Sequence, residues 1–156
     1  MSVTILRANA LTLPLADASV DLVVTSPPYF GLRSYQDGGE HYAGQLGSEA
    51  TPAEFVDALV AATREMVRVL KPSGSIWVNL GDSYYSGRNP RREGGSPLDA
   101  SGLGIPRKSL VGIPWRYAIR CIDELGLILR AEVIWSKPNP IPESVTDRVR
   151  RSHETW

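Results

Sequence analysis

A serine, two prolines and a tyrosine follow the apolar run VDLVV directly, in the stretch Thr25-Ser26-Pro27-Pro28-Tyr29. Each proline fixes its φ angle at about −65° and has no backbone N–H to donate. Ser26 precedes a proline and is therefore restricted to extended conformations. We expect a stiff segment that offers acceptors, namely the Ser26 hydroxyl and the carbonyls of Ser26 and Pro27, beside the aromatic ring of Tyr29.

Rigid acceptors beside an aromatic ring suit a reaction at an aromatic amine, such as the exocyclic amine of a nucleobase. Such an amine is a poor nucleophile because its lone pair is delocalised into the ring. Two acceptors for the amine hydrogens would favour a tetrahedral nitrogen, which can attack an electrophilic carbon held in line. Tyr29 can stack on the base, so that catalysis rests on orientation and on acceptors fixed in advance.

The pattern of the surrounding chain predicts an α/β domain with a mainly parallel sheet and flanking helices. The 156 residues fit one domain, residues 1–156. Thr51, Pro52 and Glu54 give the N-cap, first-turn proline and capping box of a helix that ends at residues 71–74. Strands are expected before and after this helix, which makes a βαβ unit with a right-handed crossover. The predicted strands are residues 3–6, 18–25, 75–80 and 127–135.

Apolar residues indicate which surfaces should be buried. The strand 18–25 is apolar without interruption from Leu22 to Val24, which predicts cover on both faces of the sheet. A second helix should begin at Pro114 and end before Gly126. Its buried face is expected at Trp115, Ile119 and Ile122, and three tryptophans are expected in the core: Trp77, Trp115 and Trp135.

Ligands of open α/β sheets bind outside the carboxyl ends of the strands, which is where residues 26–29 lie. Two polar, glycine-rich stretches flank this position. Residues 30–50 should form a long loop, and residues 81–108 a mobile insertion rich in Gly, Ser, Pro and Arg. Asp82 either faces the site or makes a turn. Residues 143–151 could form a short basic helical turn.

The distribution of charged residues, the histidine spacing and the single cysteine bear on the binding partner, on metal binding and on the cellular compartment. The chain has 17 basic and 17 acidic side chains, but residues 86–156 hold twelve of the basic ones and eight of the acidic ones. The C-terminal part is therefore the better candidate for a surface that faces a polyanion. His41 and His153 have no partners at ligand spacing, so no metal site is predicted. A single cysteine, Cys121, expected in the core, and the lack of a signal peptide or membrane-spanning run predict a cytoplasmic protein.

Four segments in this order resemble the DNA amino-methyltransferases, which transfer a methyl group from S-adenosylmethionine (SAM) to N6 of adenine or N4 of cytosine. They are NALTLPLADASVDLVVTSPPY, RVLKPSGSIWVNLGDSY, KSLVGIPWR and EVIWSKPNPIPES, and they cover nearly the whole chain. The resemblance implies a partial Rossmann-like SAM-methyltransferase fold. It also implies that the catalytic motif is Ser26, Pro27, Pro28 and Tyr29.

The same resemblance implies a cofactor contact and a substrate. Asn9 takes the place of the family's acidic residue that contacts the adenine of SAM. Serine in the first motif position is typical of cytosine-N4 enzymes, with adenine-N6 as the alternative. The partner is double-stranded DNA, whose target base must be flipped out of the helix. Phosphate contacts and target recognition would come from the insertion, through Arg88, Arg91, Arg92, Arg107 and Lys108.

Family members with this motif order continue into a glycine-rich SAM loop, roughly DPFxGSGTT, which this sequence lacks. The strands that flank the catalytic strand would also be absent, so the run DLVVT would be an unpaired sheet edge. Four interpretations follow. The chain is the catalytic half of a split enzyme completed by a second polypeptide, an inactive remnant, a chain that self-associates through the open edge, or a non-catalytic DNA-binding module.

Overall fold

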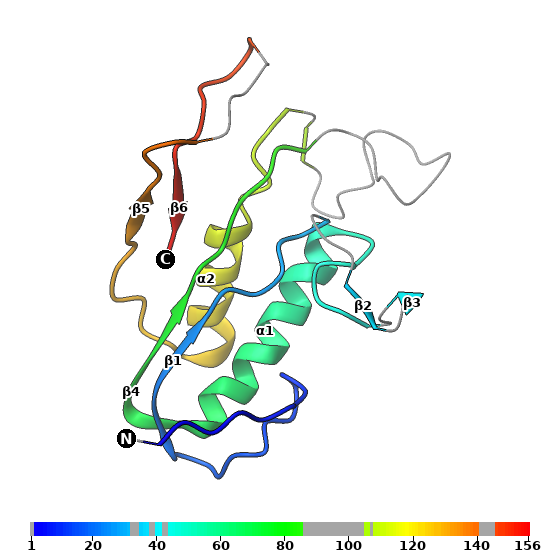
Figure 1. The fold of residues 1–156 in the computed structure, drawn as a ribbon. Helices are drawn as coiled ribbons and strands as arrows, with labels where there is room; N and C mark the ends of the chain where they lie inside the picture. The colour runs from blue at the N-terminus through cyan, green and yellow to red at the C-terminus, as the bar shows by residue number, and fades with distance from the viewer. Residues whose placement is uncertain are drawn as a thin grey trace.

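The computed structural model describes residues 2–31, 35–37, 40–41, 44–85, 105–106, 108–140 and 146–156 (Figure 1). Two helices lie side by side behind one face of a parallel pair of strands, and a short antiparallel pair stands beside that sheet. In chain order the elements are β1 (Val20–Thr25), β2 (Gln36–Asp37), β3 (Glu40–His41), α1 (Pro52–Val69), β4 (Leu70–Val78), α2 (Ile113–Leu125), β5 (Ile134–Ser136) and β6 (His153–Thr155).

The predicted βαβ unit is present, because β1 and β4 pair in parallel on either side of α1. The capping box also forms as predicted: the Thr51 hydroxyl accepts from the Glu54 N–H at 3.2 Å, and the Glu54 carboxylate accepts from the Thr51 N–H at 2.9 Å. One boundary differs. The helix runs to Val69 and β4 begins at the next residue, so residues 71–74 lie inside the strand instead of separating it from the helix.

The core lies between the two helices and one face of the sheet. Phe55 and Ile113 are fully buried, and the ring of Phe55 packs against Phe30 with 5.6 Å between centroids. Cys121 is buried, as predicted. The predicted face of α2 is wrong, since the residues it buries are Ile113, Tyr117 and Cys121. The physical reason is the packing of α2 against α1. The Tyr117 hydroxyl lies 2.7 Å from the Thr63 hydroxyl of α1, so the face of α2 that carries Tyr117 points into the core.

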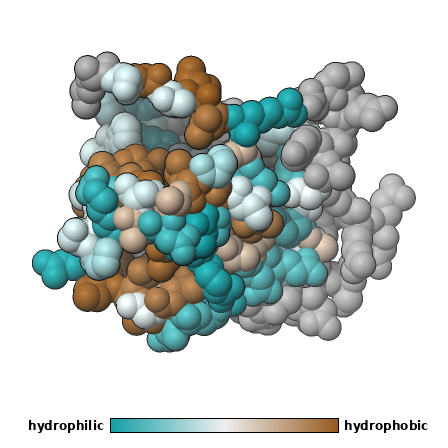
Figure 2. Space-filling model, turned by 90° about the horizontal axis from the view of Figure 1, so that it is seen from below, coloured by the Kyte–Doolittle hydropathy of each residue, from teal (hydrophilic) through white to brown (hydrophobic). Residues whose placement is uncertain are grey.

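The opposite face of the sheet is exposed in the described structure, so the prediction of cover on both faces is wrong there. Leu22 and Val24 of β1 are 52% and 59% exposed, because only one face of the strand meets the helices. The three tryptophans expected in the core are also about half exposed: Trp77, Trp115 and Trp135. Seen from below, the molecule carries broad apolar patches broken by polar side chains (Figure 2).

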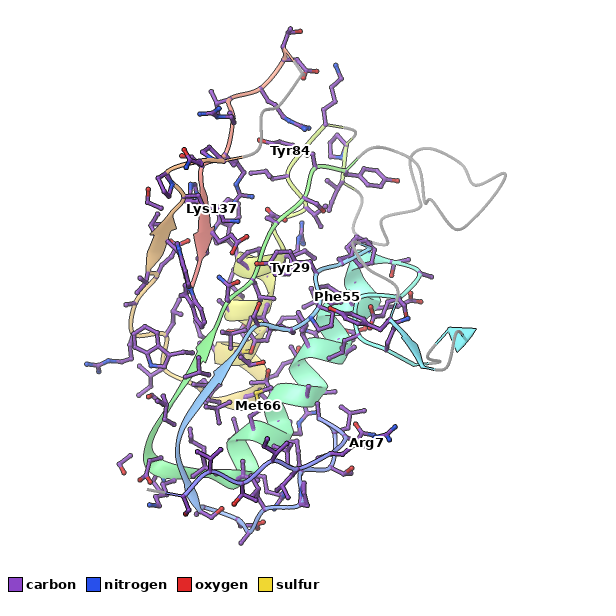
Figure 3. All side chains as sticks on the ribbon, viewed as in Figure 1. Arg7, Tyr29, Phe55, Met66, Tyr84 and Lys137 are labelled. Carbon is purple, nitrogen blue, oxygen red and sulfur yellow. The ribbon has the colours of Figure 1, made fainter. Side chains whose placement is uncertain are left out.

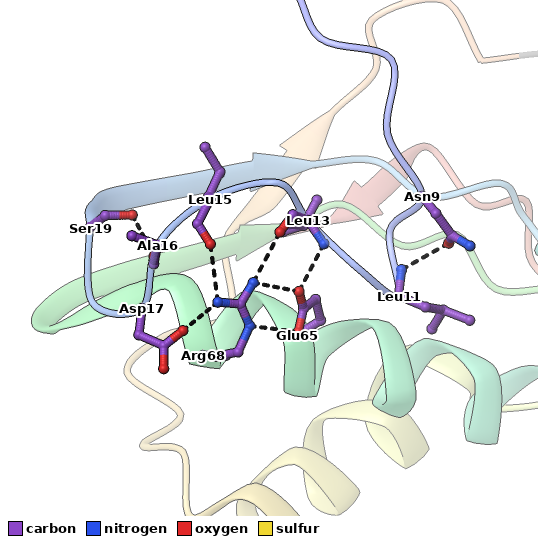
Figure 4. A network of polar contacts seen from close by, with 9 residues as sticks. All are labelled: Asn9, Leu11, Leu13, Leu15, Ala16, Asp17, Ser19, Glu65 and Arg68. Atoms are coloured by element: carbon purple, nitrogen blue, oxygen red, sulfur yellow. Dashed lines mark hydrogen bonds and ion pairs between the residues drawn. The ribbon is translucent and has the colours of Figure 1, made fainter.

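The N-terminal segment is not the strand predicted at residues 3–6; it has no strand partner among the described residues and is solvent-exposed. Its attachment to the fold is polar (Figure 4). Arg68, near the end of α1, donates to the carbonyls of Leu13 and Leu15, each at 3.0 Å, and pairs with Asp17. Glu65 accepts from Arg68 and from the Leu13 N–H, and its bond to Arg68 lowers the pKa of the Glu65 carboxyl.

The C-terminal region also departs from prediction. Of the long strand expected at residues 127–135, only the end is a strand, β5, and it pairs antiparallel with β6 at the end of the chain. The indoles of Trp135 and Trp156 stack at 5.8 Å, which holds this pair together. Residues 146–151 form bends and irregular chain and not the basic helical turn; residues 143–145 lie outside the described structure. A backbone bridge between Leu80 and Thr155 joins β6 to the chain just after β4.

Candidate active site at the ends of β1 and β4

Two polar segments meet at one edge of the sheet because β1 and β4 run in parallel. Residues 26–29 follow β1, and residues 79–82 follow β4. Ser26 is exposed, while Pro27, Pro28 and Tyr29 are partly buried. Figure 3 shows Tyr29 beyond the arrowheads of both strands. The position predicted from the sequence for these four residues is therefore the position that they occupy.

Asn79 organises this edge of the sheet, although it is only 5% exposed. Its side-chain oxygen accepts from the Tyr29 hydroxyl at 2.8 Å and from the Ser26 hydroxyl at 3.3 Å. Its side-chain nitrogen donates to the Thr155 carbonyl of β6 at 3.2 Å. The carbonyl partner fixes which way the amide points, and the two hydroxyls use both lone pairs of the amide oxygen.

The contact with Asn79 determines what Ser26 can offer to a ligand. A hydroxyl has one hydrogen and two lone pairs. Because the hydrogen of Ser26 points to Asn79, its lone pairs remain for a donor that arrives from solvent. The Pro27 carbonyl takes no hydrogen bond from the backbone of the described residues. Two neighbouring acceptors at a rigid turn can bind the two hydrogens of one amine.

Tyr29 is held by close backbone contacts as well as by Asn79. A β-carbon on Gly81 would lie 2.4 Å from the Tyr29 ring, and one on Gly47 would lie 2.8 Å from the Tyr29 carbonyl oxygen. These two glycines leave the space that the tyrosine needs. Burial, with a smaller effect from the charge of Glu154, raises the pKa of Tyr29 to about 12. The hydroxyl therefore stays protonated at neutral pH and remains a donor to Asn79.

Sequence reasoning missed three contributors to this site: Asn79, Glu154 and Thr155. The signal for Asn79 was present, since it is a polar residue in the apolar run SIWVNL, directly beyond a strand. Nothing in the sequence indicated Glu154 or Thr155. They reach the site only because β6 lies beside the end of β4, where the Leu80 N–H donates to the Thr155 carbonyl at 3.1 Å. Glu154 also pairs with Lys137.

Asp82 supports the second helix and does not open into the site. Its carboxylate is 2% exposed and accepts from the backbone N–H groups of Gly112 and Ile113 at 3.0 and 3.1 Å. These are donors at the start of α2, which has no cap from its own N-cap residue, Gly112. A buried carboxylate at a helix N-terminus satisfies unpaired N–H groups and complements the helix dipole.

Replacement of Asp82 by alanine is expected to lower the free energy of unfolding by about 1–2 kcal/mol, the usual cost of losing a helix cap. Urea unfolding followed by circular dichroism measures the change. Asp17→Ala is the matched control, because that carboxylate is 77% exposed and should contribute little to stability. Equal unfolding midpoints for the two variants would contradict a capping role for Asp82.

The remaining predicted site residues lie apart from this network. The Asn9 side chain is exposed, and its oxygen accepts from the Leu11 N–H at 2.9 Å, so its role toward a cofactor stays a prediction. Lys108 is paired with Asp147 at 2.5 Å. It stands where the insertion rejoins the fold, and its N–H donates to the Tyr85 carbonyl at 2.8 Å. The arginines at 88, 91, 92 and 107 lie outside the described residues.

The described part of the chain has no metal centre, and the hollow beside its sheet is apolar. No three metal-ligating side chains cluster there. This hollow has a volume of about 520 Å³ and is lined by the apolar side chains of Leu22, Val24, Trp77, Val133, Trp135 and Trp156. Such a surface does not suit SAM, which carries charged and hydroxyl groups. Among the described residues, no helix is long and apolar enough to cross a membrane.

Comparison with known proteins gives the family of this fold. A family model described as DNA methylase, covering the N6 and N4 enzymes, matches residues 20–156. The chain belongs to this DNA methylase family. Among curated relatives, the type II methyltransferase M.XycI of Xanthomonas campestris pv. cyanopsidis is 44% identical, and M.Cfr9I of Citrobacter freundii is 41% identical. Each match covers 97% of this chain but 52% of the relative, so this DNA methylase chain spans about half the length of these relatives.

Solved structures give the same fold. The PvuII DNA methyltransferase (cytosine-N4-specific) superposes with a TM-score of 0.61 at 24% identity, over 95% of this chain and 45% of that one. TTHA0409 of Thermus thermophilus, a putative DNA modification methylase solved in complex with S-adenosyl-L-methionine, superposes with a TM-score of 0.57 at 26% identity. The superposition covers 91% of this chain and 45% of the TTHA0409 chain. The predicted partial SAM-methyltransferase fold of this DNA methylase is therefore confirmed.

Proposed function

We propose that this chain forms the target-base half of a SAM-dependent DNA methyltransferase that modifies the exocyclic N4 amine of cytosine. The observation that carries the proposal is the contact of Ser26 with Asn79 beside the Tyr29 ring. It leaves the lone pairs of the Ser26 hydroxyl for an incoming donor, and the Pro27 carbonyl, which accepts no backbone hydrogen bond from the described residues, is the next acceptor along the turn.

The residues of this chain would prepare the amine for attack. The target cytosine, flipped out of the duplex at a cost of a few kcal/mol, would stack on Tyr29. Ser26 and Pro27 would each accept one amine hydrogen, which favours a tetrahedral nitrogen with a localised lone pair. These acceptors are already in place before the reaction, so little reorganisation is needed. SAM supplies the methyl group when it is bound.

The choice of cytosine over adenine is supported by Ser26 at the first motif position, because serine there is typical of cytosine-N4 enzymes. A further relative, M.PvuII of Proteus hauseri, is 28% identical over 131 residues. The solved PvuII enzyme is described as cytosine-N4-specific. Adenine-N6 methylation is the second candidate, because the family model covers both reactions.

Phosphate contacts are proposed for the insertion that includes Arg88 and Lys108. The insertion leaves the fold shortly after Gly81, which packs against the Tyr29 ring. Its two ends form a neck, in which the Tyr85 N–H donates to the Ser109 carbonyl at 2.8 Å and the Val111 N–H donates to the Ser83 carbonyl at 2.9 Å. Basic side chains carried on this neck would reach DNA next to the flipped base. An enzyme of this kind would act in the cytoplasm.

The test is a chimera in which this chain replaces the matched region of M.XycI in one polypeptide. Incubated with labelled SAM and mixed-sequence duplex DNA, it is expected to yield N4-methylcytosine after digestion to nucleosides and mass spectrometry. The same chimera with Ser26→Ala gives the background. N6-methyladenine as the product would favour the second candidate, and no Ser26-dependent product of either kind would refute the proposal.

A further inference from the structure

We infer that Lys137 recognises the target base: its ammonium group donates hydrogen bonds to the two acceptors, the ring nitrogen N3 and the carbonyl O2, that lie next to the amine of a flipped cytosine. The inference rests on the proposed function and assigns a specificity-determining residue to that same site. Lys137 follows β5 directly and forms an ion pair with Glu154 of β6. Neither side chain takes part in preparing the amine for attack.

Lys137 lies at the edge of the fold that carries Ser26 and Asn79. The backbone bridge between Leu80 and Thr155 is antiparallel, and β6 is antiparallel to β5. β5 therefore runs in the same direction as β4, which is parallel to β1. The first residue after each of these three strands is polar: Ser26, Asn79 and Lys137. All three lie at the carboxyl ends of the strands, where ligands of open α/β sheets bind.

The same three polar residues also share one face of the strands. Successive residues of a strand point to opposite faces, so residues two positions apart point to the same one. One residue of each strand lies two positions before the polar residue and lines the apolar hollow: Val24, Trp77 and Trp135. Glu154, which pairs with Lys137, is the cross-strand neighbour of Trp135 and therefore lies on this face as well. The polar residues thus lie together at one end of the hollow.

Glu154 holds Lys137 near the ring of Tyr29. The next residue in β6, Thr155, accepts from the Asn79 amide at 3.2 Å, so this strand is docked against the site. Burial and, after it, the charge of Glu154 raise the pKa of the Tyr29 hydroxyl, because the carboxylate lies close to it. The same carboxylate pairs with the Lys137 ammonium group. Figure 3 shows both Tyr29 and Lys137 beyond the ends of their strands.

A flipped cytosine needs hydrogen-bond donors as well as acceptors. Its Watson–Crick edge carries the N4 amine followed by the acceptors N3 and O2, and enzymes read a flipped base through this edge. Ser26 and Pro27 would accept from the amine, which leaves N3 and O2 without the donors that they had in the duplex. The Lys137 ammonium group has three donors, and its pair with Glu154 uses one of them. Its side chain is 42% exposed, so the other two can be reached by a base.

Donors at this position favour cytosine over the other bases. Adenine presents an amine and one ring nitrogen, but a C–H takes the place of the O2 carbonyl. Thymine and guanine present a ring N–H where cytosine has an acceptor, and this N–H would oppose the ammonium group. A site built to hydrogen-bond a group of its substrate rejects analogues that lack this group, because polar atoms of the site are then left unpaired. The acceptors for the amine do not make this choice, since adenine carries an amine as well.

The experiment measures how tightly the M.XycI chimera binds two duplexes that are identical except at the target position. One carries the cytosine that the chimera methylates, and the other an abasic site, which keeps the phosphates but removes the base. Lys137→Met is expected to raise the Kd for the cytosine duplex at least tenfold, as for the loss of a hydrogen bond to a charged group, and to leave the Kd for the abasic duplex unchanged. Lys71→Met is the matched control, because Lys71 is 40% exposed, pairs with Asp21 and lies at the opposite end of β4. It should leave both constants unchanged.

Equal losses on both duplexes would overturn the inference, since they would indicate a phosphate contact or a purely structural ion pair with Glu154. Unchanged binding of both duplexes would overturn it as well. Should Lys137→Met fail to fold, the unsubstituted chimera still provides a test. It should bind a duplex with 3-deazacytosine at the target position, in which a C–H replaces N3, at least tenfold more weakly than the cytosine duplex, and equal binding refutes the inference. The products of the unsubstituted chimera report on the proposed function, so a chimera that forms N4-methylcytosine without a base-dependent effect of Lys137 refutes this inference alone.

Discussion

Ser26→Ala is expected to lower kcat of the methyltransferase chimera by about 10²–10³-fold, the range found when one fixed hydrogen-bonding group is removed from a catalytic site. The KM for DNA should change little. The Ser26 oxygen accepts an amine hydrogen most strongly when the nitrogen becomes tetrahedral, so its contribution belongs to the transition state and not to DNA binding.

Single-turnover methylation and DNA affinity, measured on the same preparation, separate the two effects. Ser75→Ala serves as the control, because Ser75 is an exposed serine of β4 outside the site. A Ser26→Ala variant whose DNA affinity falls as far as its turnover would show that the serine binds substrate in its ground state. That result would contradict the assigned role.

Tyr29→Ala is expected to reduce kcat/KM by roughly 5- to 150-fold, which corresponds to the 1–3 kcal/mol that base stacking on an aromatic side chain contributes. Tyr29→Phe keeps the ring and removes only the hydrogen bond to Asn79, which is 2.8 Å long. A single hydrogen bond of about 1 kcal/mol predicts a loss of about fivefold. The aromatic surface, more than the hydroxyl, should therefore carry the effect.

A duplex with 2-aminopurine at the target position reports on the stacking itself. Its fluorescence should be quenched by the chimera with tyrosine or phenylalanine at position 29, and should rise with alanine. If Tyr29→Phe is as damaging as Tyr29→Ala in both assays, then the hydroxyl and its contact with Asn79 dominate, and the stacking role is wrong.

Structural features that depend on residues close together in the sequence were predictable from the sequence. Thr51, Pro52 and Glu54 lie within four residues of one another, and their capping box forms as expected. Pro27 and Pro28 restrict their own backbone and that of Ser26, so the stiff turn after β1 needed no knowledge of the fold. The parallel βαβ unit follows from the order of these elements.

The tertiary structure alone decided which apolar surfaces are covered. An amphipathic pattern shows that a helix has an apolar stripe, but the partner chooses between adjacent stripes. In α2 the buried face is the one that carries Tyr117, because Tyr117 contacts Thr63 of α1, which is 54 residues away in the sequence. Trp115 lies on another face of the helix and is exposed. The same reasoning applies to Leu22 and Val24, whose second cover does not come from the described residues.

The sequence determined where the amine-binding segment lies, because the prolines and the strand before them act over a few residues. The tertiary structure decided how its hydroxyls are oriented. Asn79 reaches Ser26 and Tyr29 across separations of 53 and 50 residues, and its own amide is held by Thr155, another 76 residues along. Contacts of that span arise only when β4 and β6 have docked beside β1, since no local preference of Asn79 or Thr155 favours them.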